Sequence, residues 1–156
     1  MIAIRRATAQ DAQALIDFNC AMALETERKE LLPEVIGAGV RALLANPAAG
    51  FYVVAEADER AIGALMLTKE WSDWRNGSFW WIQSVYVRPD YRRRRVYTGL
   101  YRHVQELAAT DPQACGFRLY VERANAQAQA VYRALGMSET HYRVFEELKP
   151  GVRFYR

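Results

Sequence analysis

The chain of 156 residues has few of the side chains that build metal centres and disulfide frameworks. It contains two cysteines, Cys20 and Cys115, and two histidines, His103 and His141. The cysteines lie far apart without a paired spacing, and the histidines have no partners at metal-ligand spacing. This excludes zinc-finger and disulfide-rich classes, and we expect reduced thiols and no metal cofactor.

Long apolar runs are also missing. No stretch approaches the roughly 20 apolar residues of a membrane span, and the N-terminal sequence MIAIRRATAQDAQ lacks an apolar segment of secretory length. We therefore expect a cytoplasmic protein without a membrane partner. Because no internal repeat, low-complexity tract or linker interrupts the chain, residues 1–156 are expected to form one domain.

The charge balance is mildly basic, with a net charge of +3 and a pI near 9.0, while 51% of the residues are hydrophobic. Much of the basic excess lies in one run of four arginines, residues 92–95. A local concentration of positive charge suits a polyanionic small molecule as well as nucleic acid.

The pattern of apolar residues predicts an α/β domain with a mixed sheet. A capped helix begins near Thr8, where Asp11 follows three positions later, and Pro33 opens a second helix. The third expected helix follows residue 95 and ends before Asp111-Pro112. The fourth follows Asn125, which can cap it, and carries Val131 on its apolar face. Residues 70–77 are expected to form a loop. The expected strands are residues 2–6, 51–56, 62–68, 79–87 and 117–121, with closing strands at 138–148 and 152–155.

The segment WWIQSVYVRPDYRRRRVYTGLY, residues 80–101, joins a strand to a helix through a cationic turn. The first turn of a helix carries unpaired N–H groups and the positive end of the helix dipole, so it stabilises phosphate groups. Arginines add charge and bidentate donors to that field. The segment therefore predicts an anion-binding site.

This segment and the later sequence NAQAQAVYRALGM, residues 125–137, resemble the GNAT superfamily of N-acetyltransferases over nearly the whole chain. The resemblance implies a mostly antiparallel sheet of six to seven strands flanked by four helices. It also implies acetyl transfer from acetyl-coenzyme A to an amine by direct attack in a ternary complex. Arg92 fills the first place of the cofactor signature, but Arg95 and Tyr97 stand where glycines are usual.

Carried over by resemblance, the backbone of the central strand holds the pantetheine arm, and the turn and helix start bind the pyrophosphate. Asn125 contacts the cofactor, and the Tyr132 hydroxyl faces the sulfur and acts as the acid. A phenol with a pKa near 10 can donate to a thiolate whose conjugate acid has a pKa of roughly 8.5. The implied cofactor-binding residues are Ser84, Val85, Tyr86, Val87, Arg92, Arg93, Arg94, Arg95, Val96, Tyr97, Thr98, Asn125 and Tyr132.

The acceptor amine is expected near the acidic segment between the first two helices and near the loop around residues 71–74, where the family shapes its acceptor pocket. Carboxylates beside indole rings suit a cationic amine. The expected acceptor-binding residues are Glu25, Glu27, Glu30, Trp71, Asp73 and Trp74. Glu27 is one candidate base, and the spacing does not choose among Glu25, Glu27, Glu30, Glu70, Asp73 and Glu122.

Simpler interpretations remain for the same residues. Four adjacent arginines also form ordinary solvated patches, Tyr132 on an apolar helical face suits a core, and loop tryptophans also cover sheet edges. The alternative function is a non-catalytic GNAT-like module that binds nucleic acid or protein through the arginine run. The resemblance also allows a homodimer paired through C-terminal strands.

Overall fold

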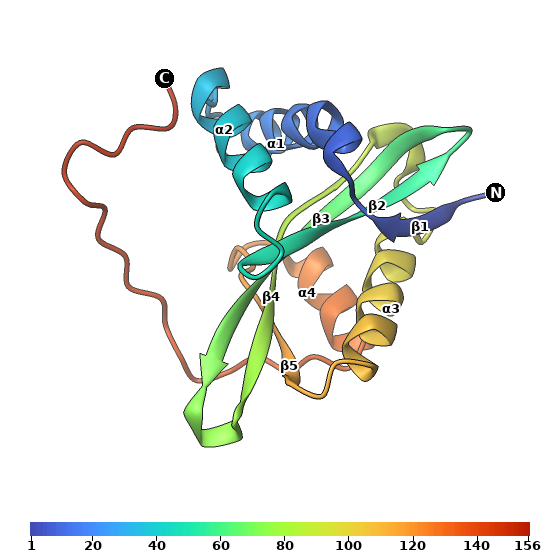
Figure 1. Cartoon of the computed structure of the whole chain (residues 1–156), viewed down its shortest axis with the longest axis vertical. Coiled ribbons are helices and arrows are strands. Elements are labelled where there is room, and N and C mark those ends of the chain that lie inside the picture. Colours follow the sequence, from blue (N-terminus) through green and yellow to red (C-terminus); the bar gives the residue numbers. More distant parts are fainter.

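The computed structural model describes all residues from Met1 to Arg156. It contains five strands and four α-helices (Figure 1). The strands are β1 Ala3–Arg6, β2 Gly50–Ala57, β3 Arg60–Ser72, β4 Gly77–Val87 and β5 Ala114–Leu119. The helices are α1 Ala12–Glu27, α2 Pro33–Leu44, α3 Val96–Ala109 and α4 Ala126–Ala134. Three short 3₁₀ segments are η1 Ala9–Asp11, η2 Asp73–Arg75 and η3 Pro89–Tyr91.

The strands form one sheet in the order β1-β2-β3-β4-β5. The first three pairings are antiparallel, and β4 and β5 are parallel because α3 connects them. The β2–β3 hairpin turns at Asp58 and Glu59, whose φ angles of 50° and 59° are typical of a two-residue type I′ turn. The prediction of a mixed, mostly antiparallel α/β sheet is confirmed.

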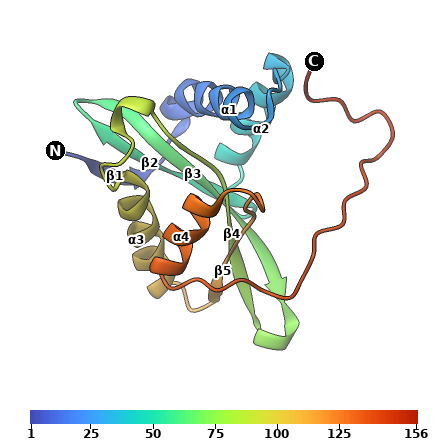
Figure 2. The ribbon, with the colours of Figure 1, turned by 180° about the vertical axis from the view of Figure 1, so that it is seen from behind.

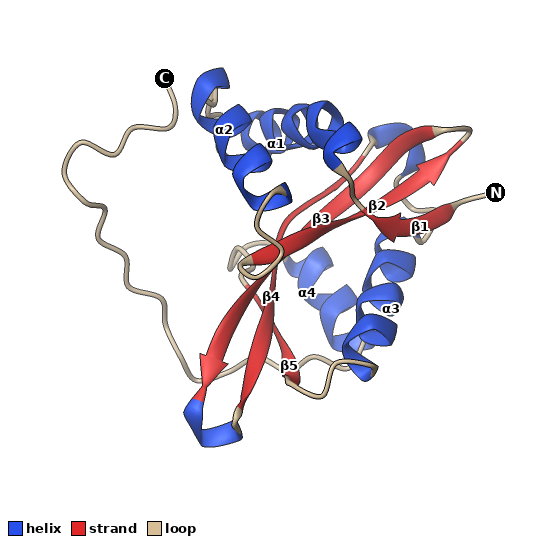
Figure 3. Cartoon of the chain, viewed as in Figure 1, coloured by secondary structure: helices blue, strands red, loops and turns tan.

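Helices cover both faces of the sheet (Figures 2 and 3). Leu15, Phe18 and Val40 of α1 and α2 pack on one face against Tyr52 and Val54 of β2. Leu100 and Val104 of α3 pack on the other face, where Leu135 after α4 joins the same cluster. None of the helices combines the length and apolar character needed to cross a bilayer.

The β3–β4 hairpin is longer than the sequence pattern predicted. Residues 70–77 were expected to be a loop, but β3 continues to Ser72 and pairs there with Gly77. Aromatic and β-branched residues favour strands, so Trp71 and Phe79 extend the ladder on both sides. A 3₁₀ turn at Asp73–Arg75 closes the hairpin.

The predicted closing strands are absent, so the sheet has five strands instead of six or seven. Residues 138–148 contain no strand, and from residue 152 onward only one isolated bridge, between Leu31 and Tyr155, is formed. We call residues 138–156 the C-terminal arm; it runs outside the body from the end of α4 toward α2 (Figures 1 and 2). A strand requires a neighbouring strand for its hydrogen bonds, and the arm has none in its own chain.

Candidate active site

A bulge in β4 opens the sheet at the predicted cofactor position. The register with β3 shifts between Ala64 and Met66, and Ser84 opposite this shift has a left-handed φ of 48°. The pairing with β5 ends at Ile82 and Leu119. The backbone of residues 83–87 therefore has an edge without a strand partner, which is where the resemblance places the pantetheine arm.

The N-terminus of α3 begins directly after the arginine run. Its first helical hydrogen bond runs from the Gly99 N–H to the Arg95 carbonyl at 3.0 Å, so the N–H groups of Val96, Tyr97 and Thr98 have no helical partner. The arginine side chains from Arg92 to Arg95 are exposed. Charge and free N–H groups therefore combine at one helix end, as an anion-binding site requires.

The missing glycine has a structural consequence at this helix start. Arg95, which stands at a signature glycine, has φ 60°, and Arg93 has φ 62°. This left-handed region costs roughly 1–2 kcal/mol for a residue with a Cβ. The backbone thus keeps a conformation that glycine adopts freely, although no glycine is present.

Arg92 is held by contacts that its place in the sequence does not reveal. Its Nε donates to the Val87 carbonyl at 2.9 Å, and its Nη2 pairs with Glu25 Oε2 at 2.7 Å. Its guanidinium also lies 5.6 Å from the centre of the Tyr86 ring. Arg92 therefore links the end of β4 to α1. Arg93, Arg94 and Arg95 form no ion pair with a carboxylate of the chain.

The helix α4 begins as predicted, at a side-chain cap. The Asn125 side chain accepts a hydrogen bond from the Ala128 N–H at 3.0 Å. Gly136, with φ 95°, follows the helix, and the Met137 N–H bonds to the Tyr132 carbonyl at 3.0 Å. Val131, which was predicted on the apolar face, is 38% exposed.

Tyr132 lies against the first turn of α3. Its ring meets the Tyr97 ring edge-on, with centroids 5.7 Å apart and an interplanar angle of 69°. Burial raises the pKa of Tyr132 above its ordinary value. The pKa of Tyr97 is raised further by burial, and its buried hydroxyl has no hydrogen-bond partner. Both phenols are therefore fully protonated at neutral pH.

The structure brings only part of the predicted acceptor set together. Glu25 and Glu27 lie in the last turn of α1, where Glu27 pairs with Lys29, and Glu30 follows in the connection to α2. The Glu30 carbonyl accepts a hydrogen bond from the Arg156 N–H at 2.9 Å. The C-terminal end of the arm therefore lies beside the connection between α1 and α2, near the start of α2 (Figure 1).

The predicted residues of the β3–β4 hairpin lie elsewhere. Trp71, Asp73 and Trp74 are at the hairpin tip, at the opposite end of the molecule from α1 and α2 (Figure 3). Trp71 is 55% exposed and Trp74 is 88% exposed. The chain thus separates these indoles from the acidic segment, because β3 extends farther than the sequence pattern indicated.

The other two candidate bases, Glu70 and Glu122, lie outside the acidic end of α1 and outside the hairpin tip. Glu70 accepts a hydrogen bond from Trp81 Nε1 at 3.0 Å and pairs with Arg118 on β5. Glu122 is exposed, and its backbone carbonyl accepts a hydrogen bond from Gln129. Glu70 therefore helps to join β3, β4 and β5 across the sheet.

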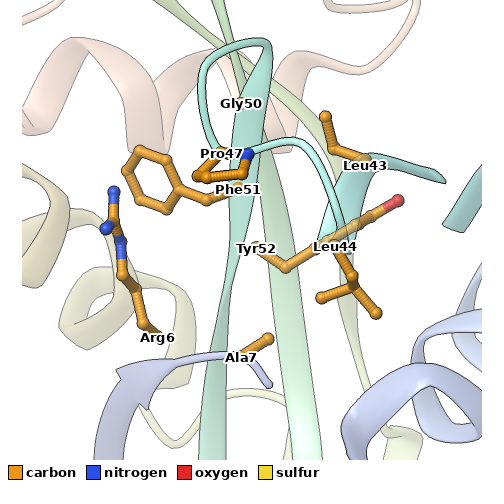
Figure 4. A pocket seen from close by; sticks show the side chains of 8 residues that line it. All are labelled: Arg6, Ala7, Leu43, Leu44, Pro47, Gly50, Phe51 and Tyr52. Atoms are coloured by element: carbon orange, nitrogen blue, oxygen red, sulfur yellow. The ribbon is translucent and has the colours of Figure 1, made fainter. Parts of the chain in front are cut away.

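A small hollow of about 100 Å³ lies away from all the predicted site residues (Figure 4). It is lined by the end of α2 and the start of β2, including Leu43, Leu44 and Phe51. Arg6 and Phe51 both line this hollow, and the Arg6 guanidinium lies over the Phe51 ring, 3.9 Å from its centre. The hollow's small size and its lining, which includes none of the predicted site residues, distinguish it from the candidate active site.

Two features of the site were not predicted. The left-handed bulge at Ser84 interrupts β4, and the polar pair Gln83-Ser84 within an apolar strand is a signal that could have indicated it. The contact between Tyr97 and Tyr132 joins two helices that are far apart in sequence. No pattern within either helix indicates that contact.

Comparison with known families places these features in context. The sequence model described as "Acetyltransferase (GNAT) family" matches residues 13–137. No curated protein sequence matches the chain.

Among solved structures, the chain is similar to a possible acetyltransferase from Clostridium difficile 630, with 41% identity and a TM-score of 0.88. That match covers 96% of this chain and 98% of the other. A predicted acetyltransferase from Clostridium acetobutylicum, solved with acetyl-CoA, is 16% identical over 94% of this chain and 96% of its own, with a TM-score of 0.79.

AAC(6')-Iy, solved with the bisubstrate analogue CoA-S-monomethyl-acetylneamine, also shares the fold. It is 19% identical over 96% of this chain and 99% of its own, with a TM-score of 0.75. At these low identities the last two structures support the fold alone.

Proposed function

Because the chain belongs to the acetyltransferase (GNAT) family, we propose that it transfers acetyl from acetyl-coenzyme A to an amine by direct attack in a ternary complex. The observation that carries this proposal is the meeting of three features on one side of the sheet. They are the free edge of β4, the cationic start of α3 and the Tyr132 phenol against Tyr97. Acyl transfer from acetyl-coenzyme A is the activity of the family to which the chain belongs.

The residues at this edge fit the acyl donor. The unpaired backbone of Ser84, Val85, Tyr86 and Val87 offers hydrogen bonds to an extended amide chain, in the manner of an added strand. The N–H groups at the start of α3 and the arginine run match a pyrophosphate. When bound, acetyl-coenzyme A supplies a thioester carbonyl that an amine can attack. One free N–H of β4 would stabilise negative charge on that carbonyl oxygen.

Tyr132 is the proposed acid. Burial keeps its pKa above its usual value, so the phenol enters the reaction protonated. It then donates that proton to the departing sulfur, as general acid catalysis requires. Asn125, which caps the same helix, fixes the start of α4 and is proposed to contact the donor.

The acceptor is proposed to be a cationic amine of a small molecule or a protein, held by Glu25, Glu27 and Glu30. Glu27 is the proposed base, acting directly or through water. Its side chain is 54% exposed and pairs with Lys29, so an entering amine can replace that lysine as its partner. Glu25 is already neutralised by Arg92, which favours Glu27 for proton removal. We also propose a cytoplasmic location, on the composition argument given above.

Calorimetric titration with acetyl-coenzyme A tests the donor site, and coenzyme A lacking its 3′-phosphate is the matched ligand. We expect a dissociation constant in the micromolar range or lower, equivalent to about −8 kcal/mol or stronger. Thiol release in the presence of a panel of polyamines, amino sugars and peptide amines then identifies the acceptor class. Salt-sensitive RNA binding without coenzyme A binding would instead favour the non-catalytic module.

A further inference from the structure

The end of α1 turns Lys29 back against the last turn of the helix. Arg28, the residue after α1, has a left-handed φ of 53°, and the Lys29 N–H bonds to the Ala23 carbonyl at 3.2 Å. A left-handed residue at a helix C-terminus directs the following chain toward the last carbonyl groups. The Lys29 ammonium therefore meets Glu27, whose Oε2 lies 2.5 Å from Nζ.

Two aromatic rings from the end of the arm complete the surroundings of this ammonium. Lys29 Nζ lies 4.9 Å from the centre of the Tyr155 ring and 5.6 Å from the centre of the Phe154 ring. Both distances are within the roughly 6 Å over which an aromatic ring attracts a cation. The two rings meet edge to face, with centroids 4.8 Å apart. We call Glu27, Phe154 and Tyr155 the ammonium cage.

The rings of the cage are positioned by backbone contacts with the connection between α1 and α2. The Leu32 N–H bonds to the Phe154 carbonyl, and the Arg156 N–H bonds to the Glu30 carbonyl, both at 2.9 Å. Tyr155 lies between these two bonds and forms an isolated bridge with the same connection. The contacts bring the end of the arm beside the end of α1 (Figure 1). Because they use backbone atoms, either ring can be replaced without removing them.

The charges around the cage favour a cation. The hydrogen bond to Glu27 raises the pKa of Lys29 above its ordinary value, and the charge of Glu146 on the arm acts in the same direction. The Lys29 side chain is 31% exposed, so the cage is open to solvent. The other lysines, Lys69 and Lys149, form no ion pair. One of three lysines in the chain is therefore held in a site with the chemistry of an amine receptor.

We propose that the ammonium cage recognises the charged amine of the acceptor, and that Lys29 occupies the cage as an internal competitor until the acceptor displaces it. This inference rests on the proposed function, because it assigns the cage to the acceptor of acetyl transfer. An alkyl amine carries the same group as lysine and is protonated at neutral pH. Phe154 and Tyr155 then select a cation over a neutral group of similar size, while Glu27 contacts its nitrogen.

An NMR titration that observes n-butylammonium, without coenzyme A, tests the cage. Lys29→Ala removes the competitor, so n-butylammonium should bind roughly 3- to 30-fold more tightly than to the unchanged protein, the range for an exposed ion pair plus exposed cation–π contacts. Neutral n-butanol, of similar size, should gain nothing. Lys69→Ala, at an exposed lysine of β3, is the matched control and should bind n-butylammonium as the unchanged protein does.

A second variant tests the aromatic wall. Tyr155 is 40% exposed, so Tyr155→Leu should leave the fold intact. Added to Lys29→Ala, it should weaken n-butylammonium binding roughly two- to fivefold and leave n-butanol unaffected. The proposal is overturned if Lys29→Ala and the unchanged protein bind n-butylammonium equally, if n-butanol gains as much, or if Tyr155→Leu costs no affinity.

The same variant separates recognition from chemistry on an identified acceptor amine. Tyr155→Leu should raise KM by a similar factor while kcat stays within about twofold, a split that a general loss of folded protein would not produce. The calorimetric titration keeps the two proposals apart. Absence of acetyl-coenzyme A binding would overturn the proposed function, because the donor site alone is measured there. Normal acetyl-coenzyme A binding, with no gain in n-butylammonium affinity for Lys29→Ala, would overturn the cage alone.

Discussion

The backbone strain at Arg95 can be measured through the free energy of unfolding of glycine variants. Arg95→Gly removes a Cβ from a left-handed position with φ 60°, whereas Arg94→Gly removes the same charge from a residue without a left-handed φ. Relief of roughly 1–2 kcal/mol is partly offset by the roughly 0.5–1 kcal/mol entropy cost of glycine. We expect Arg95→Gly to raise the free energy of unfolding by up to about 1 kcal/mol and Arg94→Gly to lower it. Urea unfolding without ligand measures both, and equal effects would contradict the strain argument.

Tyr132 is the residue whose chemical role is most directly testable. Tyr132→Phe removes the hydroxyl but keeps the ring against Tyr97, so turnover on an identified amine should fall about 100-fold, the lower range of general acid catalysis. Acetyl-coenzyme A affinity should stay within about twofold. Tyr101→Phe, a buried tyrosine of α3 outside the proposed machinery, is the control for general loss of a hydroxyl. Unchanged turnover in Tyr132→Phe would rule out the acid role.

For single residues, the sequence predicted local roles such as helix capping better than contacts between residues that are distant in the chain. The cap at Asn125 depends on neighbours three residues away, and it was predicted correctly. The Arg92–Glu25 ion pair joins residues 67 positions apart, and the Tyr97–Tyr132 contact joins two helices. Such pairs depend on the packing of whole elements, which local patterns do not contain.

Helices and strands formed as the period of their apolar residues predicted wherever another element was available to pack or pair with them. α2 begins at Pro33, and α3 ends at Ala109, before Asp111-Pro112, as the breaker residues indicated. The arm was predicted to form a strand and does not, although Tyr142 and Val144 alternate with Arg143 before Phe145 and Glu146 break the period of two. A helix forms its backbone hydrogen bonds within its own segment, while a strand requires the edge of another strand. The period of apolar residues therefore suffices to predict a helix but does not suffice to predict a strand.

The cap of α4 provides the test at the level of an element. Asn125→Ala leaves the Ala128 N–H without its side-chain acceptor and should lower the free energy of unfolding by about 1 kcal/mol. Asn125→Asp keeps an acceptor and adds a charge that favours the helix N-terminus, so its stability should match the unchanged protein. Urea unfolding of the three proteins without ligand makes the comparison. Equal losses in both variants would show that the cap does not stabilise α4.

At the scale of the whole molecule, the separation of β4 from β5 beyond Ile82 determines where the parts of the candidate active site meet. The bulge at Ser84 ends the contact of β4 with β5, and α3 and α4 pack on the same face so that Tyr97 reaches Tyr132. The same long β3–β4 hairpin carries Trp71 and Trp74 away from the acidic end of α1. One backbone irregularity thus opens the proposed donor site, while the length of one hairpin separates Trp71 and Trp74 from the proposed acceptor site.

Burial of tyrosine side chains makes the stability of the whole molecule sensitive to alkaline pH. Burial raises the pKa of Tyr52, Tyr97, Tyr101 and Tyr132 above 10.0. The folded protein therefore holds protons that the unfolded chain releases above about pH 10. This contribution to stability is fully present below pH 10 and is lost as the pH rises through the folded-state pKa values.

Urea unfolding at a series of pH values between 8 and 11.5 measures this loss, with tyrosinate absorbance reporting ionisation. The slope should steepen above about pH 10, by up to roughly 1.4 kcal/mol per pH unit for each buried tyrosine. Tyr97→Phe should flatten it by one such increment, because the Tyr97 hydroxyl has no partner to lose and the ring is kept. An unchanged slope in Tyr97→Phe would show that this phenol ionises as readily in the folded chain as in the unfolded one.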